Sequence, residues 1–177
     1  MDTSELARRM KKYEAVPKNV LMRRTPVIMR LDGRAFHTFT RNFVKPFDEV
    51  LMKAMQDTMK YLCENIQGCV LGYTQSDEIT LVLTDYKKFD YEVQKMCSIA
   101  AGLATLEFNR KMQMYSRTYA DTASDEKEEK QAEVYAKAVS NGAIFDCRVF
   151  NVPKEEVANN LYWRQLDAMR NSIQMLG

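Results

Sequence analysis

Histidine and glycine are both scarce in this sequence, which has a single histidine, His37, and six glycines among 177 residues. One histidine cannot make an HExxH zinc motif, a two-histidine metal site or an obvious catalytic triad. The glycines form neither GxGxxG nor GxxxxGKS/T, so the usual Rossmann and P-loop nucleotide sites are excluded. Any chemistry must therefore come from carboxylates, basic side chains, backbone amides or a metal bound by oxygen atoms.

Long apolar runs and cysteine pairs are absent as well. No apolar run approaches the roughly 20 residues that a membrane-spanning helix needs. The first ten residues contain four charged side chains, which argues against a secretory signal. The four cysteines contain no CxxC pair and predict neither a zinc site nor a disulfide framework, so a reducing compartment fits them. We therefore expect a cytoplasmic protein with no membrane association.

Lysine and arginine gather in the N-terminal third of the chain. Residues 1–60 carry 13 Lys and Arg against 7 Asp and Glu. Residues 61–120 carry 6 against 7, and residues 121–177 carry 7 against 10. Such a basic segment indicates a polyanion or phosphate partner, or simply a solvated surface.

Hydrophobic spacing and helix breakers predict the order of the secondary structure. A short helix follows Ser4, a long helix has Pro46 at its first position and ends at Gly68, and a last helix begins at Pro153. Strands are predicted at residues 26–31, 69–73, 79–83 and 143–150, with a second long helix from 89 to about 115. This order is the βαββαβ motif of ferredoxin-like folds. We predict an α+β fold in which two long helices back an antiparallel sheet, with extra helices at both ends.

Residues 119–133 are polar and highly charged, and we interpret them as an exposed loop that runs into a solvated helix. Asn141-Gly142 is expected to end that helix. The chain is therefore predicted to be a single domain, residues 1–177, with a polar exposed arm at about residues 116–142.

Several conspicuous side chains have ordinary structural interpretations. Asp146 and Arg148 alternate with apolar neighbours on a strand and are expected to face solvent. His37 is expected to pack or hydrogen-bond beside its loop rather than to act as a catalyst. Aromatic and methionine residues at core-like spacing are expected to lie in the interior rather than bind a cofactor: Phe36, Phe39, Met55, Met59, Met96 and Trp163.

Three carboxylates fall at strand ends. Asp32 follows the first predicted strand, and Asp77 and Glu78 lie at the turn of the central hairpin. In the βαββαβ motif these two places are neighbours on adjacent strands. Carboxylates a few Å apart stay ionised best with a cation between them, and oxygen ligands select Mg²⁺ or Mn²⁺ over zinc. Two such ions can serve phosphoryl transfer, although an Asp-Gly pair or a Ser-Asp-Glu turn alone is common without chemistry.

The segment Gly33–His37 follows Asp32 directly. Small residues at its start let backbone amides approach a phosphate chain closely. Arg30, Arg34, Arg41 and Lys45 can neutralise such a phosphate. The sequence therefore predicts a phosphate-binding loop next to the carboxylates.

Three motifs surround the predicted carboxylates and phosphate-binding loop. They are Arg30-Leu31-Asp32-Gly33-Arg34-Ala35-Phe36-His37-Thr38-Phe39, then Lys45-Pro46-Phe47-Asp48, then Gly72-Tyr73-Thr74-Gln75-Ser76-Asp77-Glu78. Together they strongly resemble the tRNA-histidine guanylyltransferase family. The resemblance extends from about Val20 to Leu176. Members dedicated to tRNA-histidine carry a His-Ile-Asn-Asn-Leu-Tyr motif. Here the matching stretch is Val157-Ala158-Asn159-Asn160-Leu161-Tyr162, so Val157 takes the place of the histidine. The chain is therefore similar to the guanylyltransferase-like branch, a template-dependent repair polymerase.

The resemblance implies a palm domain like that of nucleotide polymerases, working in the 3′-to-5′ direction. Such an enzyme activates a 5′-monophosphate on tRNA, usually with ATP, and the 3′-hydroxyl of an incoming nucleotide, usually GTP, attacks the activated end. Members use two Mg²⁺ ions, often form dimers or tetramers, and continue past the last helix with a segment that this chain does not contain.

The resemblance also implies roles for individual residues. Asp32 and Asp77 are expected to bind the two Mg²⁺ ions with help from the Gly33 carbonyl, and Glu78 to complete the catalytic carboxylates in a supporting role. The nucleotide-binding residues implied by the family are Asp32, Gly33, Arg34, Ala35, Phe36, His37, Lys45, Asp48, Ser76 and Asp77.

Two other functions stay open at the level of sequence. A palm-type nucleotide cyclase or diguanylate-type enzyme would use the same metals on free nucleotides without RNA. A catalytically silent RNA-binding fragment would bind RNA without metal dependence, but such a protein has no use for adjacent acids beside phosphates.

Overall fold

The computed structural model describes residues 4–84 and 88–176. Its elements in chain order are α1 (Glu5–Ala15), β1 (Val27–Gly33), α2 (Phe36–Phe39), α3 (Glu49–Asn65), β2 (Cys69–Gln75), β3 (Glu78–Leu83), the 3₁₀ helix η1 (Lys88–Tyr91), α4 (Val93–Thr122), α5 (Glu126–Asn141), β4 (Phe145–Asn151), the 3₁₀ helix η2 (Lys154–Glu156) and α6 (Val157–Leu176).

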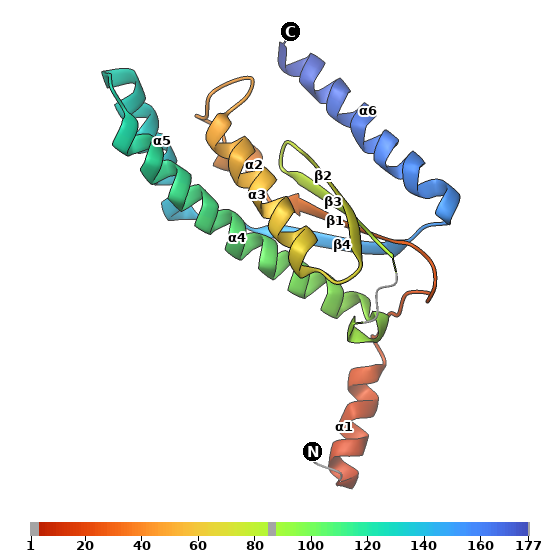
Figure 1. The fold of residues 1–177 in the computed structure, drawn as a ribbon. Coiled ribbons are helices and arrows are strands. Elements are labelled where there is room, and N and C mark those ends of the chain that lie inside the picture. Colours follow the sequence, from red (N-terminus) through yellow and green to blue (C-terminus); the bar gives the residue numbers. More distant parts are fainter. Residues whose placement is uncertain (1–3, 85–87, 177) are drawn as a thin grey trace.

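The four strands form one sheet in the order β2-β3-β1-β4, and every neighbouring pair is antiparallel. Helices α3 and α4 pack side by side on one face, and α6 lies on the opposite side of the sheet (Figure 1). The βαββαβ order and the antiparallel sheet with two long backing helices are therefore confirmed.

The core lies between the sheet and the α3–α4 layer. Alternate residues of β1, such as Met29 and Leu31, are buried there against Leu62 of α3 and Phe108 of α4. The intervening residues of β1 point to the other face because strand side chains alternate. That second face, which we call the open face, carries the polar residues Arg30 and Asp32.

Side-chain caps decide where three helices begin. Ser4 Oγ accepts the Ala7 amide at 3.1 Å, Asp48 Oδ1 accepts the Leu51 amide at 2.9 Å, and Asp125 starts α5 in the same way. Because Asp48 satisfies the free amides of the first turn, α3 begins at Glu49. The prediction that Pro46 is its first residue was wrong, and Pro46 lies before the cap.

The acidic stretch is helical rather than looped. Helix α4 continues to Thr122 and α5 begins at Glu126, so only residues 123–125 separate them. The prediction of a loop that runs into a solvated helix was wrong about the length of the loop, because a polar sequence indicates exposure and not an irregular backbone. The solvated helix and its end at Asn141-Gly142 are confirmed. Tyr119 and Tyr135 hold the two helices together with edge-on rings 5.1 Å apart. The polar arm is thus a helical hairpin, and its tip extends past the sheet (Figure 1).

Side-chain burial corrects one further expectation. Met55 and Met96 are buried as predicted, but Trp163 on α6 is 49% exposed. The guanidinium of Arg164 lies over the Trp163 ring at 4.4 Å from its centroid, so a cation–π contact replaces core packing. Within the described residues, no helix combines the length and the apolar character of a membrane span.

Candidate active site

The end of β1 and the β2–β3 turn lie side by side. Asp32 faces Glu78 in the β1–β3 register, and the amide of Gly33 donates to the carbonyl of Asp77 at 3.1 Å. One backbone hydrogen bond therefore joins the two motifs that the sequence separates by more than forty residues. The prediction that these strand ends are neighbours is confirmed.

Asp77 lies in an environment that disfavours its negative charge. Burial raises the pKa of the Asp77 carboxyl, and the charges of Asp32 and Glu78 raise it further, against the opposing effect of its own amide and the Ser76 hydroxyl. A cation beside Asp32 and Asp77 would relieve both the desolvation and the repulsion. The two carboxylates thus make this the most favourable place for a cation at the strand ends.

The available donors fit Mg²⁺. Carboxylate oxygens of Asp32 and Asp77 and the carbonyl of Gly33 are hard oxygen ligands. Over residues 4–84 and 88–176, no three His, Cys, Asp or Glu side chains converge into a metal site made by protein alone. Mg²⁺ is usually held by one or two carboxylates with substrate phosphates and water as its other ligands, which is the set that this geometry can offer.

Gly33 has no room for a side chain. A Cβ atom built there would overlap Cδ2 and Cε2 of the Phe36 ring and lie 2.7 Å from its Cγ. The ring is held in place by Phe108 and Phe145, with centroids at 5.4 and 5.2 Å. Phe36 therefore belongs to the core, as predicted, and only its backbone can serve a nucleotide.

The backbone after Gly33 presents unpaired donors. Arg34 donates its amide to the Ile144 carbonyl at 2.8 Å, and Ala35 adopts a left-handed conformation with φ of 54°. In the part of the chain that the structure describes, the amides of Ala35, Phe36 and His37 donate to no protein acceptor. Consecutive free amides at such a bend form a concave anion site, which agrees with the predicted phosphate-binding loop.

The basic side chains near this loop differ in their exposure to solvent. Arg34, Arg41 and Lys45 are exposed. Arg30 is mostly buried, and its Nε lies 3.9 Å from Oε2 of Glu78 and has no hydrogen-bond partner among the described residues. Three of the four predicted cations can therefore meet a substrate, whereas the guanidinium of Arg30 is largely closed to solvent.

Glu78 is held by hydrogen bonds within the protein. Its Oε1 accepts a hydrogen bond from Arg164 Nε at 2.8 Å and one from the Thr80 hydroxyl at 3.4 Å. Both charged side chains of the Glu78–Arg164 pair are about nine-tenths buried. This pair fastens α6 to the sheet, so the structure favours the supporting role for Glu78 over direct metal ligation.

Asp48 is fully engaged in structural hydrogen bonds. Its Oδ1 caps α3 at Leu51, and its Oδ2 accepts from the Val44 amide at 3.0 Å and the Tyr135 hydroxyl at 2.7 Å. The carboxylate therefore joins α3, α5 and the preceding loop. Contact of Asp48 and the exposed Lys45 with a nucleotide stays a prediction.

Two residues of β4 were assigned to a solvated surface without regard to the site. The β1–β4 register sets Asp146 opposite Asp32 and Arg148 opposite Arg30, on the same open face. Both side chains are more than half exposed, as expected. Only the strand register, which joins residues more than a hundred positions apart, could reveal that they flank Asp32.

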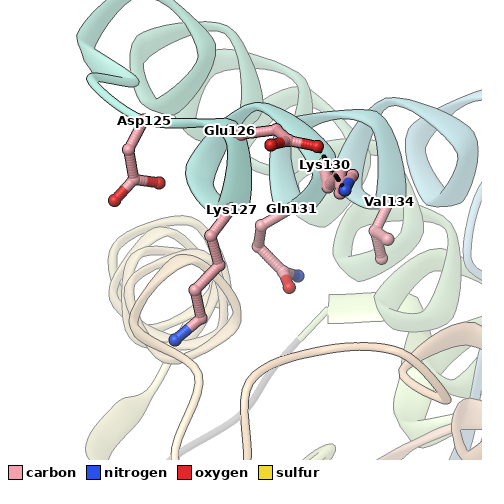
Figure 2. A pocket seen from close by; sticks show the side chains of 6 residues that line it. All are labelled: Asp125, Glu126, Lys127, Lys130, Gln131 and Val134. Carbon is pink, nitrogen blue, oxygen red and sulfur yellow. Dashed lines mark hydrogen bonds and ion pairs between the residues drawn. The ribbon is translucent and has the colours of Figure 1, made fainter.

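A surface hollow on α5 lies apart from these carboxylates (Figure 2). Lys127 and Gln131 point from the helix toward the chain preceding α3, and Gln131 Nε2 donates to the Asn42 carbonyl at 3.3 Å. The lining residues are Asp125, Glu126, Lys127, Lys130, Gln131 and Val134. None of them is a predicted site residue, and we assign the hollow no role.

Comparisons with known proteins agree with this geometry. A family model described as tRNAHis guanylyltransferase (Thg1) matches residues 7–153. The chain belongs to this family. The Thg1 match covers both motifs that carry Asp32 and Asp77, and it confirms the family predicted from the sequence.

Three relatives illustrate the Thg1 similarity. An uncharacterized protein of Acanthamoeba polyphaga mimivirus is 32% identical over 183 residues, which cover 94% of this chain and 60% of the viral protein. A bacterial Thg1-like protein solved in complex with GTP is 39% identical, with a TM-score of 0.80 over 98% of this chain and 75% of its own. A bacterial Thg1-like protein in complex with ATP is also 39% identical, with a TM-score of 0.79 over 97% and 69%.

Proposed function

We propose that this chain is the palm unit of an Mg²⁺-dependent nucleotidyltransferase that adds nucleotides, typically G, to the 5′ end of tRNA in the 3′-to-5′ direction. The observation that carries the proposal is the backbone hydrogen bond from Gly33 to Asp77, which brings Asp32 and Asp77 together at the ends of the two central strands. Membership of the Thg1 family supports the reaction type.

Nucleotide binding rests on the loop after β1. The free amides of Ala35, Phe36 and His37 can receive phosphate oxygens, and Arg34 can add a charge-assisted contact. The complexes of bacterial relatives with GTP and with ATP support these nucleotides as substrates of this chain. Ser76, next to Asp77 in the turn, is proposed as a second nucleotide contact.

Catalysis on this proposal is mostly positioning and charge neutralisation. The attacking group is the 3′-hydroxyl of the incoming nucleotide, and the target is the activated 5′ phosphorus of the RNA. As the new phosphodiester bond forms, the anhydride bond to the activating nucleotide breaks, and AMP leaves where ATP was the activator. Two Mg²⁺ ions held by Asp32, Asp77 and the Gly33 carbonyl would neutralise phosphate oxygens and align the reacting groups. Glu78 keeps the hairpin turn in place through Arg164 rather than contacting the reactants.

The whole protein's partners are part of the proposal. The chain spans 60% of the length of its mimivirus relative, and tRNA binding, templated repair and assembly into dimers or tetramers belong to the proposal. A cytoplasmic location likewise stays an expectation.

A primer-repair assay tests the proposal. The chain is incubated with Mg²⁺, ATP, GTP and a tRNA that lacks its first nucleotide, with either C or A at the opposing position. We expect G to be added opposite C and not opposite A. Asp32→Asn and Asp77→Asn should each lower the rate at least about 100-fold, because even indirect partners at metal sites cost 10- to 100-fold.

A matched control separates carboxylate loss from general damage. Glu126→Gln removes an exposed carboxylate on α5 that pairs only with Lys130 in the described contacts, and it should leave the rate unchanged. Product formed from GTP alone would favour a nucleotide cyclase instead. Full activity of Asp77→Asn would overturn the assignment of the site.

A further inference from the structure

The open face of the sheet is covered unevenly. Arg164 of α6 reaches Glu78, and the open-face residues of β3, namely Glu78, Thr80 and Val82, are all buried. On the β4 side, the corresponding side chains of Asp146 and Arg148 are 54% and 56% exposed. The carboxylate of Asp32 is therefore approachable from β4 and closed off toward β3.

Arg148 is an exposed cation of this face that can meet an anion. Its opposite neighbour Arg30 is mostly buried, and its Nε lies 3.9 Å from the Glu78 carboxylate that Arg164 already contacts at 2.8 Å. Among the described residues, Arg148 pairs only with Asp146 at 3.9 Å, and an exposed pair with such geometry contributes little to stability. The guanidinium can therefore exchange Asp146 for a phosphate with little loss.

Distance along the sheet sets which phosphate Arg148 can reach. Arg148 lies diagonally across from Asp32, and diagonal neighbours in an antiparallel pair are about 7–8 Å apart. Arg34 lies beside the start of the same strand, because its amide bonds to the Ile144 carbonyl. Arg148 thus flanks Asp32 on the β4 side, apart from the amides and the Arg34 side chain assigned to the nucleotide.

We propose that the open face of β4 binds the 5′-terminal strand of the RNA substrate and that Arg148 contacts a backbone phosphate. This inference rests on the proposed function and adds the side from which the RNA reaches Asp32. A polynucleotide fits better than a second free nucleotide because the open face of β4 is extended and lies outside the loop of unpaired amides.

The test compares the removal of one arginine from the open face of β4 with the removal of one from α4, so that both variants lose the same charge. Arg148→Ala is measured against Arg110→Ala, which removes an exposed arginine from α4 on the other side of the sheet. Binding of a fluorescent 5′-truncated tRNA is followed by anisotropy at several salt concentrations. We expect Arg148→Ala to weaken RNA binding about tenfold and to reduce the salt slope by about one contact. Arg110→Ala should change neither, and Arg148→Lys should restore most of the affinity.

Activity measurements then distinguish this inference from the proposed function. Arg148→Ala should raise the KM for tRNA and leave the KM for GTP within about twofold. A raised KM for GTP, or RNA binding equal to that of Arg110→Ala, would overturn the β4 surface even with an active enzyme. If the unaltered chain adds no nucleotide, the proposed function fails, while the binding comparison of the two variants still decides whether β4 binds RNA.

Discussion

Adding one methyl group to Gly33 tests how firmly the candidate active site is fixed. In Gly33→Ala the new Cβ overlaps the Phe36 ring, and the ring cannot retreat because Phe108 and Phe145 pack against it. Overpacking of this kind costs about 1–3 kcal/mol, and the reduced freedom of the unfolded chain offsets about 0.4–1 kcal/mol of that. We expect a net loss of about 1–2 kcal/mol, or about 2–8 °C in Tm for a chain of this size.

Gly102 provides the matched control. Gly102→Ala adds the same methyl group inside α4, where no heavy atom lies within 4 Å of the new Cβ. Alanine in a helix interior is more stable than glycine by about 0.5–1 kcal/mol. Urea unfolding followed by circular dichroism should therefore show opposite signs for the two variants.

Removing the ring isolates the contact itself. Phe36→Ala is expected to cost about 3–5 kcal/mol, but in that background Gly33→Ala should cost almost nothing more, because the overlapping atoms are gone. A Gly33→Ala protein as stable as the unaltered chain would refute the steric argument. So would a Gly33→Ala cost that stays the same with or without the Phe36 ring.

Three further substitutions probe the charges of the site and its surroundings. Arg164→Ala leaves Glu78 buried without its closest partner and should lower the free energy of unfolding by about 3–5 kcal/mol, which urea midpoints would show. Since burial raises the pKa of the Asp77 carboxyl, the unaltered protein loses stability as pH rises through that pKa. Without Mg²⁺, the urea midpoint of Asp77→Asn should therefore rise relative to that of the unaltered chain as the pH goes from acidic to neutral. Added Mg²⁺ should stabilise only the unaltered chain. A hydrogen bond from Cys147 lowers the pKa of the Cys97 thiol to about 7, so the rate at which iodoacetamide alkylates Cys97 should reach half its maximum near that pH. Cys147→Ala should move this midpoint to higher pH. Mass spectrometry of the alkylated peptides measures the rate in each protein.

The sheet and its two backing helices were predictable because each has a local signal. The alternating residues of β1 and the helical spacing after Asp48 are readable without tertiary knowledge. Helix α2 was not predicted, since a single turn has too few residues to show a period and depends on the left-handed backbone of Ala35. The end of α4 was misplaced because Tyr119 is held by Tyr135, a partner from another helix.

The candidate site was predictable where chain order alone brings residues together. Asp32 and Asp77 meet because the βαββαβ order makes β1 and β3 neighbours. The Arg164–Glu78 pair was not predictable, because it depends on how α6 crosses the sheet. The closeness of Asp146 to Asp32 was hidden for the same reason, since a register between distant strands leaves no mark in either strand.

Two backbone hydrogen bonds tie the start of the site loop to the β2–β3 turn and to the segment before β4. Gly33 is tied to the Asp77 carbonyl and Arg34 to the Ile144 carbonyl, so the three segments meet without the help of the Arg34 or Ile144 side chains. Mutation can therefore exchange those two side chains while the spacing of the carboxylates is preserved. Evolution can therefore alter which nucleic acid binds at these strand ends without changing the arrangement of the catalytic carboxylates.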